Sequence, residues 1–246
     1  MRTDRRILVL STLLSLTMAA LPAPATPALY GSSGLIRIPT AYTLCRGEFD
    51  AAVDLHYARS TAGAPDVRFL DQRVVTGVFG DGDHGLELGV HRESIDAAAG
   101  SSTAITGKYR FPGILPLGAF AIGGRVNVGG QDQNAVYVVG STSAAKSFAV
   151  HYGAGANLSN GRGLFSHYGG KDDGLDTDRF FAMFGAEMDW NDFKLNVDFN
   201  GDTMAYGINY FPADSVVCNV FYINNGDMER LTGTRQSVGL GVTVQF

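Results

Sequence analysis

The alternation of apolar and polar residues, repeated along almost the whole chain, constrains the fold of this sequence more than any other feature. Between Phe49 and Tyr57 every second residue is apolar, and most of the residues between them are polar. Successive side chains of a β-strand point to opposite faces, so this pattern predicts a strand with one apolar face. Twelve such segments can be counted between Phe49 and Phe246. Most of them reach the length of about 9 to 11 residues that a bilayer-spanning β-strand needs.

The connections between these segments indicate how the strands are arranged. Short connections, such as 80–83 and 112–116, alternate with longer ones, such as 59–67 and 159–178. Long outer loops and tight periplasmic turns are typical of outer-membrane barrels. We therefore predict an all-β fold, a closed antiparallel transmembrane β-barrel of about 12 strands that spans residues 47–246. A soluble exported β-sandwich is the alternative fold.

Residues 1–28 resemble a signal peptide. Three arginines precede an apolar stretch of 14 residues, Ile7 to Ala20, and small residues follow. This stretch is shorter than the roughly 20 residues of a membrane-spanning helix. We expect cleavage after Ala28, or after Ala25, and export toward the outer membrane of a Gram-negative-type envelope. Residues 29–46 would then form a periplasmic lead-in segment or a cap over the lumen.

Composition excludes several functional classes. The formal net charge is −5 and the basic residues do not cluster, so the chain lacks the concentrated basic surface of a nucleic-acid-binding protein. Two cysteines, Cys45 and Cys218, cannot form a disulfide framework. A closed barrel would hold them roughly 9 to 10 Å apart, so we expect two free thiols. Four aspartates between 172 and 178 have no calcium-loop spacing and predict a solvated loop. We expect no cofactor and no bound metal.

The polar strand faces are expected to line the lumen. Acidic and basic residues occur together on them, which suits either a network of ion pairs or a narrow wet pore. A carboxylate beside a histidine can orient a general base, and Asp54 with His56 and Glu87 with His91 have this arrangement. No Ser or Cys nucleophile accompanies either pair, so we expect no catalytic residue and no enzymatic activity. The candidate lumen-facing residues are Glu48, Asp50, Asp54, His56, Glu87, His91, Lys108, Arg110, Arg125, His151, Glu187, Asp189, Lys194 and Asp198.

The C-terminal segment 239–246 ends on an aromatic residue after apolar residues at alternate positions. It resembles the signal by which the barrel-assembly machinery recognises outer-membrane proteins. Phe246 is therefore the candidate assembly signal, and outer-membrane lipid and that machinery are the expected partners.

The segment Gly34-Leu35-Ile36-Arg37-Ile38-Pro39-Thr40-Ala41, followed by Gly47 and an alternating strand, resembles the opening of YjbH-like outer-membrane proteins. That family is associated with exopolysaccharide production or export. The resemblance implies a non-enzymatic envelope barrel linked to exopolysaccharide export or surface assembly, with polysaccharide or its export proteins as possible partners. A small porin-like channel for solutes is the alternative function, because the lumen is expected to be charged.

Overall fold

The structure is a computed structural model that describes residues 26–29, 31–60, 66–81, 84–96, 100–113, 118–129, 134–158, 180–201, 203–224 and 234–246. No helix in these ranges is long and apolar enough to cross a membrane. Most of the export signal, the long outer connections and the acidic loop at 172–178 lie outside the described residues.

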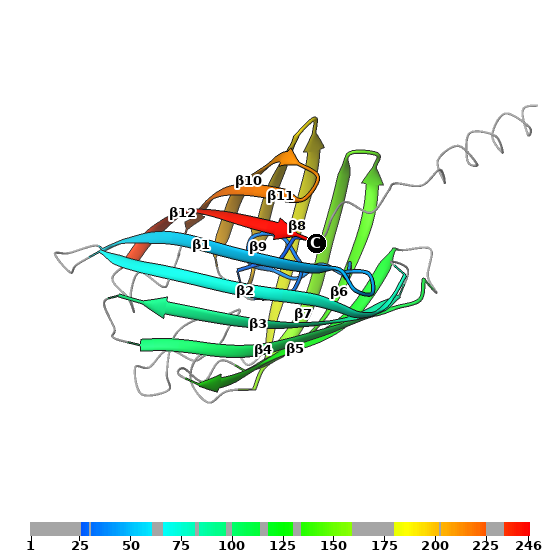
Figure 1. Ribbon diagram of the computed structural model, residues 1–246, viewed down its shortest axis with the longest axis horizontal. Helices are drawn as coiled ribbons and strands as arrows, with labels where there is room; N and C mark the ends of the chain where they lie inside the picture. The colour runs from blue at the N-terminus through cyan, green and yellow to red at the C-terminus, as the bar shows by residue number, and fades with distance from the viewer. Residues whose placement is uncertain are drawn as a thin grey trace, which may run out of the picture.

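Twelve antiparallel strands form one closed barrel, which confirms the predicted fold and excludes the sandwich (Figure 1). Each strand pairs with the next along the chain, and β1 pairs with β12 to close the ring. The strands are β1 (Phe49–Ser60), β2 (Val67–Gly80), β3 (Gly85–Ile95), β4 (Gly100–Phe111), β5 (Ala119–Gly129), β6 (Ala135–Ala145), β7 (Phe148–Asn157), β8 (Phe180–Trp190), β9 (Phe193–Phe199), β10 (Met204–Ala213), β11 (Val216–Asn224) and β12 (Thr234–Gln245).

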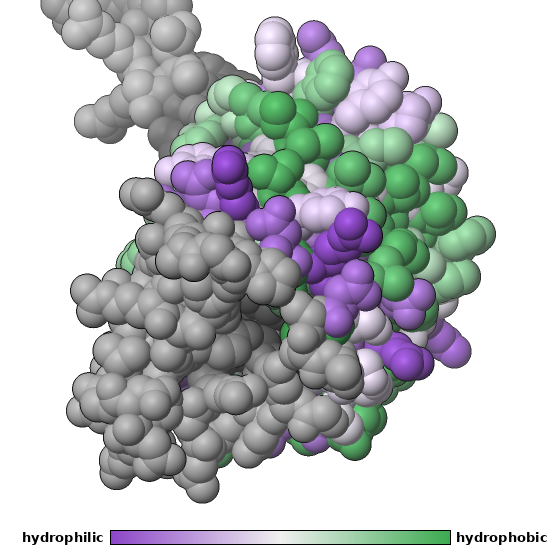
Figure 2. All heavy atoms as spheres, turned by 90° about the vertical axis from the view of Figure 1, so that its left-hand side faces the viewer, coloured by the Kyte–Doolittle hydropathy of each residue, from purple (hydrophilic) through white to green (hydrophobic). Residues whose placement is uncertain are grey.

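The two faces of each strand differ in polarity as the alternation predicts. On β1, Val53 is 49% exposed on the outer wall, whereas the adjacent Asp54 is 1% exposed inside. Green apolar side chains cover much of the outer wall in Figure 2. The wall therefore presents apolar residues to the hydrocarbon of a bilayer, as transmembrane barrels require. Both cysteines are free, as predicted.

Residues 31–44, which precede β1, lie inside the barrel, where Figure 1 shows them as a blue trace within the ring of strands. We call residues 31–44 the lumenal segment. Two isolated bridges, Pro27 with Ser33 and Gly34 with Pro39, fold this part of the chain back on itself. Leu35 and Ile38 belong to a buried cluster with Tyr137, Val139, Phe181 and Met183 on the wall.

Two wall glycines show how closely the barrel fits this part of the chain. A Cβ at Gly77 of β2 would overlap the carbonyl oxygen of Cys45. A Cβ at Gly185 of β8 would overlap Leu35 and lie 2.9 Å from Ile38. Strand glycines of this kind permit close approach of another segment. The inner wall is thus shaped around the lumenal segment.

Candidate functional site

Three carboxylates occupy one level of the lumen because of the strand register. Asp54 on β1 is paired with Asp71 on β2, which is in turn paired with Glu93 on β3. Asp54 is compensated: Arg73 forms a close ion pair with it, and Asn219 donates a hydrogen bond of 2.8 Å to its Oδ1. Like charges directly opposite each other destabilise a sheet, so the remaining two carboxylates also need compensation.

A buried histidine contacts the middle carboxylate of this row. His91 Nε2 lies 2.8 Å from Asp71 Oδ1, and Arg125 Nη1 lies 3.0 Å from His91 Nδ1. A guanidinium can only donate, so Nδ1 accepts, and Nε2 carries the proton that is donated to Asp71. On the other side, His56 Nε2 lies 3.9 Å from Asp71 Oδ2. These residues form a connected polar cluster on β1, β2, β3 and β5.

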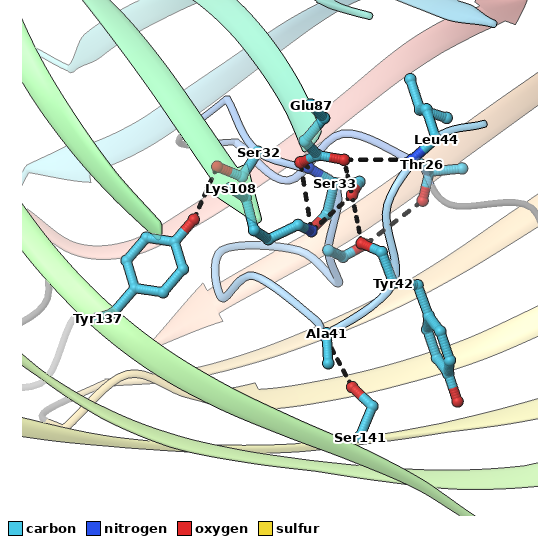
Figure 3. Close-up of polar contacts among 11 residues, drawn as sticks. Thr26, Ser32, Ser33, Ala41, Tyr42, Leu44, Glu87, Lys108, Tyr137 and Ser141 are labelled. Carbon is cyan, nitrogen blue, oxygen red and sulfur yellow. Dashed lines mark hydrogen bonds and ion pairs between the residues drawn. The ribbon is translucent and has the colours of Figure 1, made fainter. Parts of the chain in front are cut away.

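A second cluster holds the lumenal segment to β3 and β4 (Figure 3). The backbone N and Oγ of Ser33 donate to the two carboxylate oxygens of Glu87, over 2.9 and 2.6 Å. Lys108 Nζ donates to the carbonyl oxygen and Oγ of Ser33, over 2.7 and 2.6 Å, and lies 3.2 Å from Glu87 Oε1. The Lys108 and Glu87 side chains are 0% and 1% exposed. Lys108 thus compensates a carboxylate that would otherwise be costly to bury.

The other attachments reach different parts of the wall. Arg37 donates from its backbone N and its guanidinium to Asp198 of β9, with the backbone bond at 2.7 Å. Its guanidinium also donates to the carbonyl oxygen of Thr203 over 2.6 Å. The backbone N of Ala41 donates to Ser141 Oγ on β6 over 2.8 Å (Figure 3). The lumenal segment therefore connects strands on several sides of the barrel.

A third group of charges lies on β7, β8 and β9. His151 Nδ1 bonds Ser141 Oγ at 2.8 Å, and its Nε2 lies 3.7 Å from Glu187 Oε1. Lys194 lies 3.2 Å from Glu187 and 3.8 Å from Asp189, whose side chain is 47% exposed. These contacts connect Ser141 on β6 with the charged residues beside the β8–β9 turn.

The remaining candidates are Asp50 and Glu48, near the start of β1, and Arg110, beside the lumenal segment. Asp50 is buried and accepts a weak hydrogen bond of 3.4 Å from Gln245. Arg110 places its guanidinium 5.4 Å from the centre of the Tyr42 ring.

Glu48 is exposed and accepts a hydrogen bond of 2.8 Å from the backbone N of Cys45. Burial, followed by the charge of Glu48, raises the pKa of the Cys45 thiol.

The structure does not form the two pairs that the sequence suggested as catalytic. Asp54 bonds Arg73 rather than His56, and Glu87 bonds Lys108 and the lumenal segment rather than His91. Side chains two positions apart on a strand are separated by about 6.6 Å, whereas cross-strand neighbours lie about 5 Å apart. Partners are therefore found on neighbouring strands.

Sequence reasoning also missed several site residues. Asp71 and Arg73 lie in a segment whose alternation is weak. Glu93 follows His91 by two positions and therefore lies on the same strand face as Glu87 and His91. That spacing was a usable signal for Glu93. Ser33 and Arg37 precede the first strand, where no periodicity assigns a face.

A small cavity borders the lumenal segment. It has a volume of about 20 Å³ and lies between the segment and β10, β11 and β12. This volume is about that of one water molecule. Its lining includes Leu29, Ile36, Arg73, Asn209 and Phe221.

No protein-family model matches this sequence, and no curated protein matches it. Among solved structures, the KdgM porin in complex with disordered oligogalacturonate matches with a TM-score of 0.50 and 8% identity, over 81% of this chain and 99% of that chain. The NanC porin matches with a TM-score of 0.52 and 12% identity, over 79% and 98% of the two chains. An active-site mutant of outer membrane phospholipase A from Escherichia coli matches with a TM-score of 0.54 and 10% identity, over 93% and 95%.

These likenesses show that the fold is that of outer-membrane barrels. They do not extend to YjbH-like proteins or to exopolysaccharide export in particular. The phospholipase also contradicts the expectation of a non-enzymatic protein, because an enzyme is built on the same kind of barrel. That expectation was wrong because it rested on the lack of a Ser or Cys nucleophile beside the two carboxylate–histidine pairs, and one fold hosts several functions.

Proposed function

We propose that this protein is a porin-like channel for hydrophilic solutes in the outer membrane, closed at rest by its own lumenal segment. The observation that carries the proposal is the polar attachment of that segment to a charged inner wall. Glu87, Lys108 and Asp198 hold it through hydrogen bonds and ion pairs. Water or a polar solute can replace such contacts, whereas a uniformly apolar interior would exclude both.

The proposed resting state is closed because the segment fills the centre of the barrel. Barrels of eight strands are filled by their own side chains and those of sixteen hold a water channel, so twelve strands leave room that something must occupy. Here Leu35 and Ile38 pack against the wall on one side, and Ser33 is bonded on the other. Opening requires this segment to shift or to leave the lumen.

Saccharides are the class of solute that we propose. The resemblance of residues 34–41 to YjbH-like proteins points to exopolysaccharide, and the KdgM porin of similar fold was captured with oligogalacturonate. The finer proposal of a role in exopolysaccharide export rests on that resemblance. Arrival at the membrane would follow export by the signal at 1–28 and recognition of Phe246 by the barrel-assembly machinery.

Conductance in planar lipid bilayers tests the proposal. The purified full chain is compared with a variant that lacks residues 31–44, each first checked for folding by heat-modifiable migration in detergent. We expect low conductance with rare openings for the full chain, and a several-fold larger, steady conductance for the deletion variant. Liposome swelling with neutral and acidic oligosaccharides then compares the permeating solutes.

A deletion variant that is folded but carries no current would refute the channel. A full chain with the same large steady current as the deletion variant would refute closure by the lumenal segment. Permeation by salt but by neither class of oligosaccharide would leave a channel and remove the saccharide proposal.

A further inference from the structure

We propose that the lumen holds a divalent transition-metal site, formed by Asp71, His91 and Glu93 and completed by His56, and that Zn²⁺ is its natural class of ligand. One ligand atom from each of the first three residues lies within 4.8 Å of the others. The site is distinct from the attachments of the lumenal segment through Glu87 and Asp198. It therefore stands or falls independently of the channel.

The backbone register creates this site. Asp71 and Glu93 are direct partners on β2 and β3, and His91 precedes Glu93 by two positions on the same face. A tetrahedral Zn²⁺ with bonds of about 2.0 to 2.2 Å holds its ligand atoms about 3.4 Å apart. His91 Nε2 and Asp71 Oδ1 are already 2.8 Å apart. Small rotations of these side chains thus suffice to place all three around one ion.

An unsatisfied buried atom is the second observation that points to a ligand. Asp71 Oδ2 is buried without a hydrogen-bond partner among the described residues. Asp71 is 1% exposed, so this oxygen receives no compensation from bulk water. A buried polar atom without a partner costs about 1 to 3 kcal/mol. An ion between Asp71 and the imidazole of His56, which lies 3.9 Å from Oδ2, would satisfy that oxygen.

The charges around the cluster also suit a cation. The row of Asp54, Asp71 and Glu93 is faced by Arg73 and Arg125, and Arg73 forms its ion pair with Asp54. Arg73 also acts on Asp71, and Arg125 acts on Glu93, so two guanidinium charges oppose the three carboxylates of the row and one negative charge remains. Two paired carboxylates of like charge in a buried setting favour a divalent ion between them.

The donor set selects the kind of metal. Two imidazoles and two carboxylates suit Zn²⁺ and neighbouring transition metals, whereas Ca²⁺ and Mg²⁺ prefer oxygen donors alone. Glu93 lies two residues before the outer end of β3 and is half-buried, so it leaves the site open on the outward side of the lumen. Metal would therefore reach the site from that side.

Arg125 opposes metal binding in the state described here. It donates to His91 Nδ1, which leaves the proton on Nε2, the atom that would bind the ion. Binding through Nε2 releases that proton and makes Nδ1 the donor, so the guanidinium must turn away. Replacement by glutamine would supply an amide oxygen that can accept from Nδ1, as second-shell partners of metal-bound histidines do. Arg125→Gln should therefore bind Zn²⁺ more tightly.

The test is titration of Zn²⁺ into the folded full chain in detergent, followed by calorimetry and by the rise in thermal midpoint. Co²⁺ serves as a second probe, because its absorption reports nitrogen and oxygen ligands directly. We expect one site per chain. Asp71→Asn and Glu93→Gln should each weaken binding at least about tenfold, and Arg125→Gln should strengthen it.

His84→Ala is the matched control, because His84 pairs with Asp81 at 3.1 Å on the surface, away from the lumen. Glu93→Gln keeps the shape of a half-buried side chain and is therefore expected to fold. If Asp71→Asn, at a more buried position, does not fold, the Zn²⁺ affinity of Glu93→Gln tests the site. Equal affinity in Glu93→Gln and the parent chain, loss of binding in His84→Ala, or the absence of any Zn²⁺ binding by the parent chain would each overturn the proposal.

Discussion

The buried ion pair between Lys108 and Glu87, two wall residues that both bond Ser33, is expected to be the strongest polar anchor for the lumenal segment. The perturbation is Lys108→Met, which keeps the length of the aliphatic stem and removes the charge. Both side chains are essentially unexposed, and their charged atoms lie 3.2 Å apart. Removal of one partner from a buried pair costs about 3 to 5 kcal/mol, because the other charge stays buried.

The structure places this variant at the lower end of that range. After the substitution Glu87 still accepts hydrogen bonds from Ser33, over 2.9 and 2.6 Å, and a longer one from Leu44. These donors keep part of the compensation, so we expect a loss of about 3 kcal/mol in the free energy of unfolding. The double variant Glu87→Met with Lys108→Met removes both charges together. It should be more stable than the sum of the single variants predicts, by up to about 3 kcal/mol.

The assay is equilibrium unfolding by denaturant in lipid or detergent, followed by the fluorescence of Trp190, the only tryptophan of the chain. Asp81→Asn, which removes an exposed charge beside His84, is the control and should change stability by less than about 0.5 kcal/mol. A Lys108→Met variant as stable as the control, or a double variant whose loss equals the sum of the single losses, would refute the reasoning.

Three further outcomes are expected from other parts of the structure. Gly77→Ala should loosen the attachment of the chain at Cys45, because the added Cβ would overlap the carbonyl oxygen of Cys45, and maleimide labelling of the Cys45 thiol should become faster. Gly113→Ala is the control and should leave labelling unchanged, because a Cβ at Gly113 would have no atom within 4 Å. The raised pKa of the Cys45 thiol means that its thiolate forms at higher pH, so maleimide labelling should be slow near neutrality. Glu48→Gln should shift the pH profile of the labelling rate to lower pH, and an unshifted profile would contradict the effect of Glu48 on this pKa. Phe246→Ala should reduce the yield of folded barrel in cells more than it reduces refolding in detergent. In detergent the loss is the ring stack with Phe49, whose centroids lie 4.5 Å apart, worth about 0.5 to 1.5 kcal/mol. Equal losses in cells and in detergent would contradict a role of Phe246 as an assembly signal.

The barrel was predictable because each strand carries its own two-faced pattern. On β9, Lys194 and Asp198 alternate with Phe193 and Leu195, and the structure buries the first pair and leaves the second toward the outer wall. This information is local to the strand. The buried and exposed faces of a strand can therefore be predicted without knowing which strands are its neighbours.

The site was less predictable because its contacts depend on register. The sequence places Asp54 and His56 on one face, yet only the alignment of β1 with β2 brings Arg73 to Asp54 and Asp71 toward His56. The contacts of the lumenal segment were less accessible still. Arg37 reaches Asp198 across 161 positions of sequence, and nothing in the residues around either one indicates the other.

The pairing of β1 with β12, which closes the ring, has a consequence for folding. Residues 31–44 make bonds to β3, β4, β6 and β9, which belong to both halves of the ring, so we expect them to dock most readily before β1 pairs with β12. A molecule in which the seam closes early leaves residues 31–44 outside the lumen, and they can then enter only through an end of the closed barrel. Two long-lived forms of the same chain, distinguishable by protease, should then arise from fast and slow refolding.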